Sequence, residues 1–342
     1  MPHTVIAQEL TDILTPIYLD HGVSEEDTAK VVHYQVDSNL CGHDSHGALR
    51  TPIYTKLIRE GRVQPDAPFE VVEEHTASMV VDGNRNLGFI VTERAQDLLF
   101  EKASTVGVAA LSIRNQSHVG RLGAYTERAA ERGFAALMMA DSGRGPKSVA
   151  PFGGSDRRLG TNPISIALPA SLDGPVLMDM ATSAVAGGKI KVARSKGEAM
   201  GKGWAIDKDG NATTDPEDFY AGGALLPLGA DQGHKGYSLS FMVESLAAVL
   251  SGIGYGADAE GFPNDAILMV LLNIEMFRPL QGFKDEMAEF ARYVKASPVA
   301  EGFDEVLYPG EFEARNRQRR RVEGIELPDR VWNDLQELLP SS

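Results

Sequence analysis

The middle of the chain alternates short apolar runs with amphipathic helical stretches, and this alternation constrains the fold more than any other feature of the sequence. The apolar runs are bounded by turn residues, as buried strands are. They occupy residues 70–72, 78–81, 107–113, 135–140, 164–168, 176–180 and 267–272. Helical periodicity occupies residues 91–103, 123–132 and 237–250. A chain with this alternation is predicted to fold as an α/β protein, with helices packed on a sheet.

Both ends of the chain read as helices. Ser24 stands before an acidic first turn and apolar residues at helical spacing, which is typical of a capped helix. A second helix is predicted from about His46 through Ile58, and the tail is helical again apart from a turn at 309–310. The expected organisation is a helical domain from residues 1–68 and 281–342 and an α/β cofactor-binding domain from residues 69–280.

The charge balance excludes some partners. Of 342 residues, 33 are Lys or Arg and 48 are Asp or Glu, so the formal net charge is −15. This excess repels phosphate backbones and anionic lipid, so we expect neither a nucleic-acid nor a membrane partner. The one basic run, Arg315 to Arg321, lies among glutamates. It is either a solvated helix face or a phosphate contact.

Cysteine usage and the absence of an apolar leader predict a cytoplasmic protein. Cys41 is the single cysteine, which excludes an internal disulfide framework and a Cys-rich zinc site. The first residues lack a basic segment followed by an apolar one, so a secretory signal is not expected. The longest apolar stretch, 266–274, is well short of the about 18 residues that a spanning helix needs.

The familiar nucleotide-binding fingerprints are missing. The nearest match to GxGxxG, at 252–257, follows a predicted helix instead of a strand, so its glycines more naturally end that helix. GxxxxGK[ST] is absent as well. A nucleotide, if one binds, must be held by another arrangement.

The densest polar cluster is His43-Asp44-Ser45-His46-Gly47, with Arg50 and Tyr54 following. On one helix, His46, Arg50 and Tyr54 share a face, because residues four apart are neighbours. An imidazole, a guanidinium and a phenol together suit a small carboxylate ligand. In the alternative interpretation Ser45 caps the helix and Arg50 pairs with an acidic neighbour.

A second candidate is His118, in the loop between a predicted strand and a predicted helix. Such loops carry many catalytic groups of α/β proteins, and an imidazole exchanges protons near neutral pH. The plainer interpretation is a surface histidine. A metal site on His43 and His46 lacks a third ligand at a diagnostic spacing, and a Ser–His hydrolase lacks GxSxG, so we expect no metal.

Several turns combine small and hydroxyl residues, at 152–154, 160–163, 179–183 and 187–189. Turns of this kind offer backbone N–H groups to phosphates, although ordinary turn chemistry explains each one separately.

Together these segments resemble the malate/L-lactate dehydrogenase family. The matching segments are GHDSHGALR (42–50), NQSHVGRLGAY (115–125), VAPFGG and LGTNP (149–163), MDMATSAVAGGKI (178–190), GWAIDKDGNATTDP (203–216), LLPLG (225–229), GHKGYSL (233–239) and YPGE (308–311). This is a non-Rossmann group of 2-hydroxyacid oxidoreductases that also includes ureidoglycolate and sulfolactate dehydrogenases and cyclic imino-acid reductases.

The resemblance implies hydride transfer between NADH or NADPH and a small 2-oxo acid, giving an L-2-hydroxy acid such as malate or lactate. It also implies a non-Rossmann NAD(P)-binding α/β core and a homodimer. The alternatives are a cyclic imino-acid reductase and, as a weaker one, a metal-dependent hydrolase. Imino-acid reductases of the family tend to carry an acidic residue where this chain has Lys189, which favours the hydroxyacid.

Residue roles follow from the same resemblance. Ser45 and His46 fall in the catalytic cluster, Arg50 on the substrate carboxylate and Tyr54 in the substrate pocket. His118 matches the general acid/base of some members, whereas others use the histidine matching His46. The residues that match cofactor-binding segments are His118, Gly120, Thr161, Asn162, Asp179, Met180, Ala181, His234, Lys235, Gly310 and Glu311. Arg144 and Lys147 either meet a second substrate carboxylate or are exposed loop charges.

Overall fold

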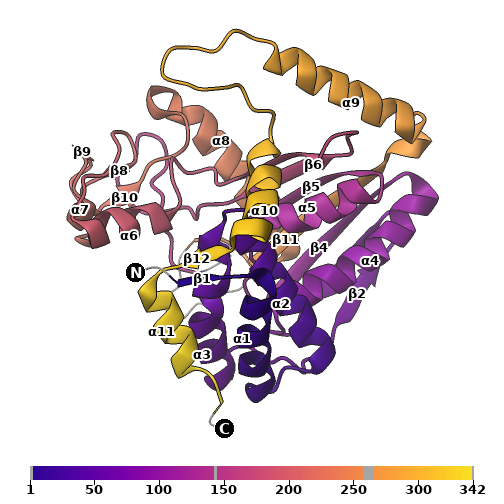
Figure 1. The fold of residues 1–342 in the computed structure, drawn as a ribbon, viewed down its shortest axis with the longest axis horizontal. Helices are drawn as coiled ribbons and strands as arrows, with labels where there is room; N and C mark the ends of the chain where they lie inside the picture. Colours follow the sequence, from indigo (N-terminus) through magenta and orange to yellow (C-terminus); the bar gives the residue numbers. More distant parts are fainter. Residues whose placement is uncertain (1–2, 142–144, 257–264, 341–342) are drawn as a thin grey trace.

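The computed structural model describes residues 3–141, 145–256 and 265–340. Its centre is a seven-stranded mixed sheet in the order β2-β3-β4-β11-β5-β6-β7 (Figure 1). The strands are β2 (Glu70–Glu74), β3 (Ser78–Asp82), β4 (Val108–Gln116), β5 (Phe134–Asp141), β6 (Ile164–Leu168), β7 (Val176–Met180) and β11 (Asp265–Asn273). β3 and β4 are parallel, and the other neighbouring pairs are antiparallel. All seven predicted strands are confirmed.

The register places several loops at one edge of this sheet. β11 runs between β4 and β5 and is antiparallel to both, with Leu268 opposite Ser112 on one side and Met139 on the other. β3, β4 and β5 therefore point the same way. The segments that follow these three strands emerge at a single edge, where open α/β sheets bind ligands.

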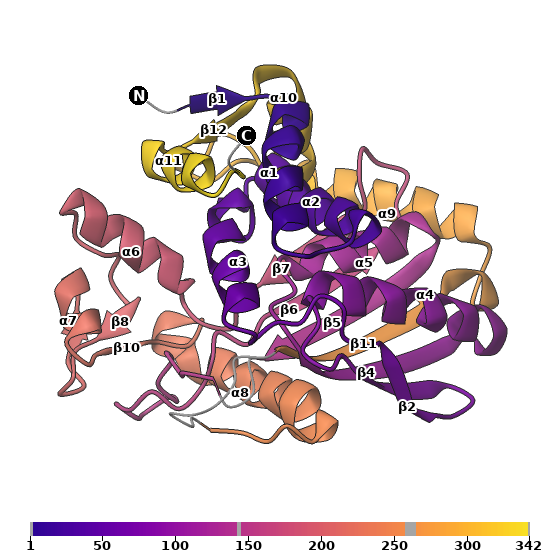
Figure 2. The same ribbon diagram turned by 90° about the horizontal axis from the view of Figure 1, so that it is seen from below.

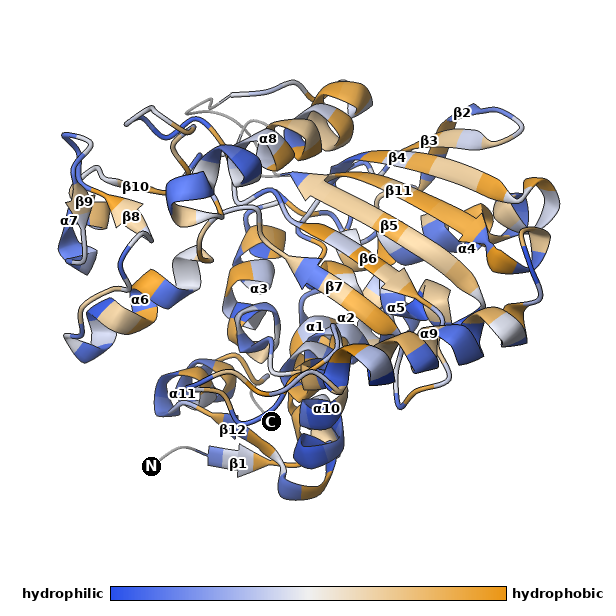
Figure 3. Ribbon diagram, turned by 90° about the horizontal axis from the view of Figure 1, so that it is seen from above, coloured by the Kyte–Doolittle hydropathy of each residue, from blue (hydrophilic) through white to orange (hydrophobic). Residues whose placement is uncertain are grey.

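Helices cover both faces of the sheet. α4 (Gly88–Val106) and α5 (Leu122–Glu131) lie on one face, and α8 (Gly233–Glu244) with a π-helical turn (Ser245–Val249) lies on the other (Figure 2). β5 alternates between them: Met138 packs in the core with α4 and α5, whereas Met139 packs against Val243 of α8. Figure 3 shows β4, β11 and β5 as the apolar centre between these layers.

The two ends of the chain meet. β1 (His3–Val5) pairs with β12 (Ile325–Leu327). The helices around this pair are α1 (Ala7–Asp20), α2 (Glu25–Leu40), α3 (Thr51–Arg59), α10 (Glu311–Glu323) and α11 (Asp329–Glu337), and α9 (Leu280–Lys295) lies apart from them (Figures 1 and 2). One buried apolar cluster runs from Leu14 of α1 to Ile113 of β4. In the described residues, no helix is both long and apolar enough for a bilayer crossing.

A small lobe projects beside the main sheet. It contains a sheet of order β10-β8-β9, formed by β8 (Ala205–Ile206), β9 (Ala212–Thr213) and β10 (Ala224–Leu225), with α6 (Gly187–Lys196) and α7 (Pro216–Tyr220). Ile190 and Leu225 belong to its own apolar cluster. The sequence pattern does not predict these strands, because two residues are too few to show a periodicity.

Candidate active site

The segment that carries Ser45 and His46 is not the start of an α-helix. Residues Asp44–His46 and Ala48–Arg50 form two separate 3₁₀ turns, and α3 begins only at Thr51. The prediction of one helix from His46 to Ile58 is therefore wrong at its beginning. The reason is a contact with the preceding helix, because a Cβ on Gly47 would lie 2.1 Å from Oδ1 of Asn39. That oxygen accepts the N–H of Ala48 at 2.8 Å and fixes the break between the turns.

Five of the predicted side chains nevertheless form one connected group around His118. Arg50 Nη2 lies 3.5 Å from Nε2 of His118, and the Tyr54 hydroxyl lies 2.7 Å from its Nδ1. The ring of His46 stacks on that of His118 at 5.7 Å between centroids, and Ser45 Oγ lies 3.0 Å from Nδ1 of His46. The structure thus joins the two 3₁₀ turns, α3 and the loop after β4.

Hydrogen bonds orient the His118 ring. The backbone N–H of Gly120 points at Nδ1 from 3.2 Å, and a peptide N–H can only donate. This favours the neutral tautomer with its proton on Nε2, so that the Nε2–H and the Arg50 guanidinium 3.5 Å away are two donors that need an acceptor oxygen between them. Gly120 has φ +75°, and a Cβ there would lie 2.6 Å from the Phe89 ring, so glycine is required.

The site favours neutral imidazoles and leaves a positive charge without a counter-ion. Burial, reinforced by the nearby charges of Arg50 and His46, holds the pKa of His118 well below its usual range. Burial and Arg50 likewise lower the pKa of His46 to about 3. Within the described residues, Arg50 pairs with no carboxylate, and its buried Nε has no hydrogen-bond partner. The alternative in which Arg50 pairs with an acidic neighbour is therefore wrong, and the site suits an anion.

Three of the segments expected to bind a cofactor form a continuous patch through Thr182. The N–H of Thr182 donates to Thr161 O at 2.9 Å, and its hydroxyl donates to Asn162 O at 2.9 Å. The carbonyl of Thr182 accepts the N–H of Leu228 at 2.9 Å. Gly236 packs closely on Leu228, because a Cβ on Gly236 would lie 2.2 Å from the Leu228 carbonyl oxygen. The segments at 161–162, 179–182 and 234–236 are thus neighbours.

The side chains of this patch differ in their surroundings. The buried amide of Asn162 donates to Glu244 and Ser240, so it faces the protein interior. His234 and Lys235 are exposed in the first turn of α8, and Met180 and Ala181 are partly buried after β7. Gly188 of α6 faces Ser45, since a Cβ on it would lie 4.0 Å from the Ser45 Cβ.

Asp179 links this patch to the histidine loop. Its carboxylate accepts the N–H of Gly123 at 2.8 Å and so caps the start of α5, which the histidine loop enters. Burial raises the pKa of Asp179, although the guanidinium of Arg121 opposes that shift.

Gly310 lies against β7, where the Leu177 N–H donates to Pro309 O at 3.0 Å. Glu311 accepts from Tyr308 N at 3.1 Å and pairs with Lys295 and Arg315.

Comparison with known proteins decides the family. The family model described as malate/L-lactate dehydrogenase matches residues 5–336. The chain belongs to the malate/L-lactate dehydrogenase family. The resemblance inferred from the sequence motifs and the predicted α/β fold class are confirmed.

Individual members of the malate/L-lactate dehydrogenase family match over nearly the whole chain. The malate dehydrogenase of Pyrococcus horikoshii is 37% identical over 93% of this chain and 89% of its own. The crystal structure of malate dehydrogenase from Entamoeba histolytica superposes with a TM-score of 0.94 at 28% identity, covering 99% of this chain and 97% of that one. The δ1-piperideine-2-carboxylate reductase of Pseudomonas syringae superposes with a TM-score of 0.86 at 31% identity, covering 98% and 99%.

Within this family member, Lys147 has neither of the roles considered for it. It is buried, and its ammonium lies 2.7 Å from Glu244 and 3.5 Å from Asp141. Lys147 is therefore neither an exposed loop charge nor a free partner for a substrate carboxylate. Arg144 lies outside the described residues.

The basic run of α10 also proves different from both interpretations. Arg317 pairs with Asp37 of α2 and Glu127 of α5, and Arg320 pairs with Asp44 beside His46. These arginines join α10 to the rest of the protein instead of forming a solvated face or a phosphate contact, although Arg319 on the same helix is exposed.

One group of metal-type ligands exists in the described part of the chain: Asp37, Cys41 and Glu127. The guanidinium groups of Arg121 and Arg317 already lie against both carboxylates, so these acids are neutralised without an ion. Burial raises the pKa of the Cys41 thiol to about 12, which keeps it protonated and a poor ligand.

Sequence reasoning missed the residues that hold the site in place. Asn39 fixes the two turns, and Arg320 with Asp44 anchors the first of them. No local signal marks Asn39, since it sits inside a helix. Arg320 and Asp44 are 276 residues apart, and only the fold brings them together.

Proposed function

We propose that this family member is an NAD(P)-dependent dehydrogenase that interconverts a small 2-oxo acid and the corresponding L-2-hydroxy acid. The observation that carries the proposal is Arg50, a partly buried guanidinium with no carboxylate partner in the described residues, 3.5 Å from Nε2 of His118. The planar guanidinium of Arg50 can bind a carboxylate through two hydrogen bonds, and the imidazole N–H beside it can donate to the adjacent carbonyl oxygen.

The chain has residues that fit a pyridine nucleotide. The first turn of α8 offers exposed Lys235 together with helix N–H groups, which suits a pyrophosphate. Thr161 and Ala181 line the same patch, and Gly187 and Gly188 leave open space at the start of α6. When bound, the reduced nicotinamide supplies the hydride. NAD and NADP both remain candidates, because both contain the pyrophosphate.

The residues around His118 then have separate roles in binding and proton transfer. Arg50 holds the substrate carboxylate, and the Nε2 proton of His118 polarises the carbonyl oxygen. Binding of the acid brings a negative charge that offsets Arg50 and raises the pKa of His118, so that the ring can take up a second proton on Nδ1, which can then donate to the Tyr54 hydroxyl oxygen. His118 delivers its Nε2 proton to the developing alkoxide. Tyr54 and the Gly120 N–H hold the ring in place.

We assign the proton donor to His118 and a supporting role to His46. The reactive nitrogen of His118 faces Arg50 directly, whereas Nδ1 of His46 is engaged by Ser45 and its ring stacks on His118. His46 therefore forms a wall of the pocket and keeps water from the His118 ring.

The test is the oxidation of NADH and NADPH, followed by absorbance, with a panel of 2-oxo acids. We expect Arg50→Gln to raise KM about 10- to 100-fold, as loss of a charge-assisted pair predicts. His118→Asn should lower kcat at least about 100-fold while the Kd for the cofactor changes little. Near-normal kcat in His118→Asn, or a larger loss of kcat in His46→Gln than in His118→Asn, would contradict the assignment. EDTA should leave turnover unchanged, whereas metal-dependent hydrolysis would support the hydrolase that uses His43 and His46.

A cyclic imino-acid reductase is the second candidate, favoured by the similarity to the Pseudomonas syringae enzyme. Lys189 argues against it, because this exposed cation stands beside Gly188, which faces Ser45, and repels a protonated imine. Including Δ1-piperideine-2-carboxylate in the substrate panel separates the two. Turnover of the imine with a higher kcat/KM than every oxo acid would make it the substrate.

We also propose a homodimer and a cytoplasmic location. The family resemblance and an exposed apolar face on α8 support the homodimer. A chain with a single, buried cysteine has no internal disulfide, which suits a reducing compartment.

A further inference from the structure

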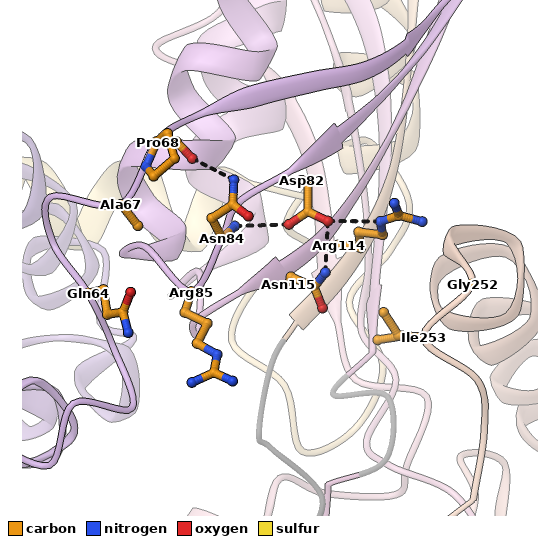
Figure 4. Close-up of a pocket in the computed structure, with 10 residues that line it drawn as sticks. All are labelled: Gln64, Ala67, Pro68, Asp82, Asn84, Arg85, Arg114, Asn115, Gly252 and Ile253. Carbon is orange, nitrogen blue, oxygen red and sulfur yellow. Dashed lines mark hydrogen bonds and ion pairs between the residues drawn. The ribbon is translucent and has the colours of Figure 1, made fainter.

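The loop that carries His118 is short, and contacts hold both of its ends. It runs from Ser117 to Arg121, between the last residue of β4 and the first residue of α5. Just before it, Asn115 of β4 donates from Nδ2 to Asp82 of β3 at 2.8 Å (Figure 4). At its end, Arg121 directly precedes α5, and its side chain is only 1% exposed. The position of the His118 ring therefore depends on what holds Arg121.

Arg121 belongs to a buried cluster of four charges. Its Nη2 lies 2.9 Å from Asp37 of α2 and 3.0 Å from Glu127 of α5. Arg317 of α10 binds the same two carboxylates, with Nε 3.0 Å from Asp37 and Nη1 2.6 Å from Glu127. Burial would raise the pKa of Asp37, but Arg121 and Arg317 hold that pKa below its usual value. This four-charge cluster therefore pairs two cations with two anions and joins the His118 loop to three helices.

Stability alone does not account for the four-charge cluster. Replacing a buried ion cluster by apolar residues of similar volume is often neutral or stabilising, because the charges lose their hydration. Arg121 adds to this cost, since its buried Nε and Nη1 have no hydrogen-bond partner in the described part of the chain. Buried ionic groups do fix one arrangement of their surroundings in some proteins. The location of this cluster, behind the His118 loop, points to such a use.

The cluster restricts the backbone beside His118. Gly120 directly precedes Arg121, and its N–H points at His118 Nδ1 from 3.2 Å. Gly120 has φ +75° and no side chain of its own to hold it, so this peptide is the most permissive point of the loop. An anchor on the next residue fixes the direction of the Gly120 N–H, and with it the orientation of the His118 ring.

The first turn of α5 confines the Arg121 guanidinium from the other side. A Cβ on Gly123 would lie 2.5 Å from Arg121 Nη1 and 2.7 Å from Asp179 Oδ2. The same Asp179 oxygen, on β7, accepts the Gly123 N–H at 2.8 Å. Arg121 is thus enclosed between the acids of the four-charge cluster and the start of α5, and it has one position available.

We propose that Arg121 is a positioning residue for His118, held in place by Asp37, Glu127 and Arg317. It acts through the backbone of Gly120, because its own guanidinium is buried against the acids of the cluster. Its effect on turnover rests on the proposed function, in which His118 delivers the proton. The orientation of the ring is a property of the free protein and is measured without turnover.

The first experiment measures kcat, the KM for the oxo acid and the Kd for NADH. Arg121→Gln should lower kcat about 10- to 100-fold, as a displacement of His118 by about 1 Å predicts, with KM and Kd changed less than about twofold. Arg121→Lys should recover part of the lost kcat, since lysine keeps the charge but not the planar guanidinium. Arg94→Gln leaves the buried Asp27, also on α2, without its cation, so it is the matched control and should keep the wild-type kcat.

A double variant separates positioning from charge balance. Arg121→Met with Glu127→Gln removes one cation and one anion, so Asp37 and Arg317 remain as a neutral pair. Its Tm should stay close to that of the wild type, because no buried charge is left uncompensated. Its kcat should nevertheless be as low as that of Arg121→Gln, because nothing then holds the end of the loop.

A second experiment follows the NMR signals of the carbon-bound protons of the His118 ring in the free protein. They should move in Arg121→Gln and in the double variant, and not in Arg94→Gln. Unchanged kcat in Arg121→Gln, with or without a lower Tm, would overturn the proposal, because the arginine would then be structural. Wild-type kcat and ring signals in the double variant would overturn it as well. If the wild type reduces no oxo acid, the proposed function fails, and the ring signals alone decide whether Arg121 positions His118.

Discussion

Arg50 and His118 form an electrostatically coupled pair. Burial is the main reason that the pKa of His118 is low, and the guanidinium 3.5 Å away adds to the effect because it repels the imidazolium form. The free protein therefore holds a neutral ring next to a fixed positive charge. In the mechanism that we propose, substrate binding charges the ring, since an anion on Arg50 removes the repulsion.

This coupling predicts that Arg50→Met raises the pKa of His118. The substitution keeps the length of the side chain and removes the charge, while the ring stays buried, so the pKa should move up toward 6.5 without reaching it. An NMR titration of the imidazole carbon-bound protons measures the shift. Lys56→Met, in the adjoining helix α3 but exposed, is the matched control and should leave that pKa in place. An unchanged pKa in Arg50→Met would show that burial alone sets it.

Among the elements, α10 holds the turn that carries His46. Arg320 makes a bidentate pair with Asp44, at 2.7 Å and 3.1 Å, and also donates to Asn39 O. Asn39 in turn donates to Asp44 at 2.7 Å and accepts from Ala48. His43, the residue before Asp44, lies 3.1 Å from Glu313 of α10. α10 therefore fixes the beginning of the turn, whereas Asn39 of α2 fixes its end.

We expect Arg320→Gln to lower kcat about 10-fold through the position of His46 while the Kd for the cofactor is unchanged. Arg320→Lys should recover part of the lost kcat, since lysine restores the positive charge but not the bidentate guanidinium. Arg319→Gln, which removes an exposed charge from the same helix, is the control. The chemical shift of the His46 ring should move in Arg320→Gln and not in Arg319→Gln. Loss of thermal stability with unchanged kcat would assign Arg320 a structural role only.

The elements also show what sequence could predict. Each strand of the main sheet is a local apolar run, so its position follows from residues within it, and the segment from Ala135 to Ala140 is an example. The break at Gly47 depends on Asn39, and the pairing of Arg320 depends on Asp44. Contacts of this kind have no local periodicity. Sequence therefore predicts the strands of the scaffold, whereas the contacts that shape the segment from Ser45 to Arg50 appear only in the fold.

For the whole molecule, one face of α8 remains without a partner in the described chain. Its inner face packs on the sheet through Val243 and Ala247. Its outer face and the turn after it expose large apolar side chains, between 37% and 60% accessible: Phe241, Met242, Leu246, Val249 and Leu250. Apolar residues clustered in this way mark a protein interface more often than a free surface. The occupant that we propose is the same face of a second copy, which gives the symmetric pairing typical of homodimers.

Replacing two of these residues should separate the dimer. Met242→Glu with Val249→Glu places four charges in a symmetric contact, so the mass by sedimentation or light scattering should fall from twice 36.9 kDa to 36.9 kDa. Val192→Glu, an exposed apolar residue of α6, is the control and should leave the dimer intact. The buried core is untouched, so the circular dichroism spectrum should be retained. A wild-type mass of 36.9 kDa at micromolar concentration, or a dimer that survives both substitutions, would place the contact elsewhere or exclude it.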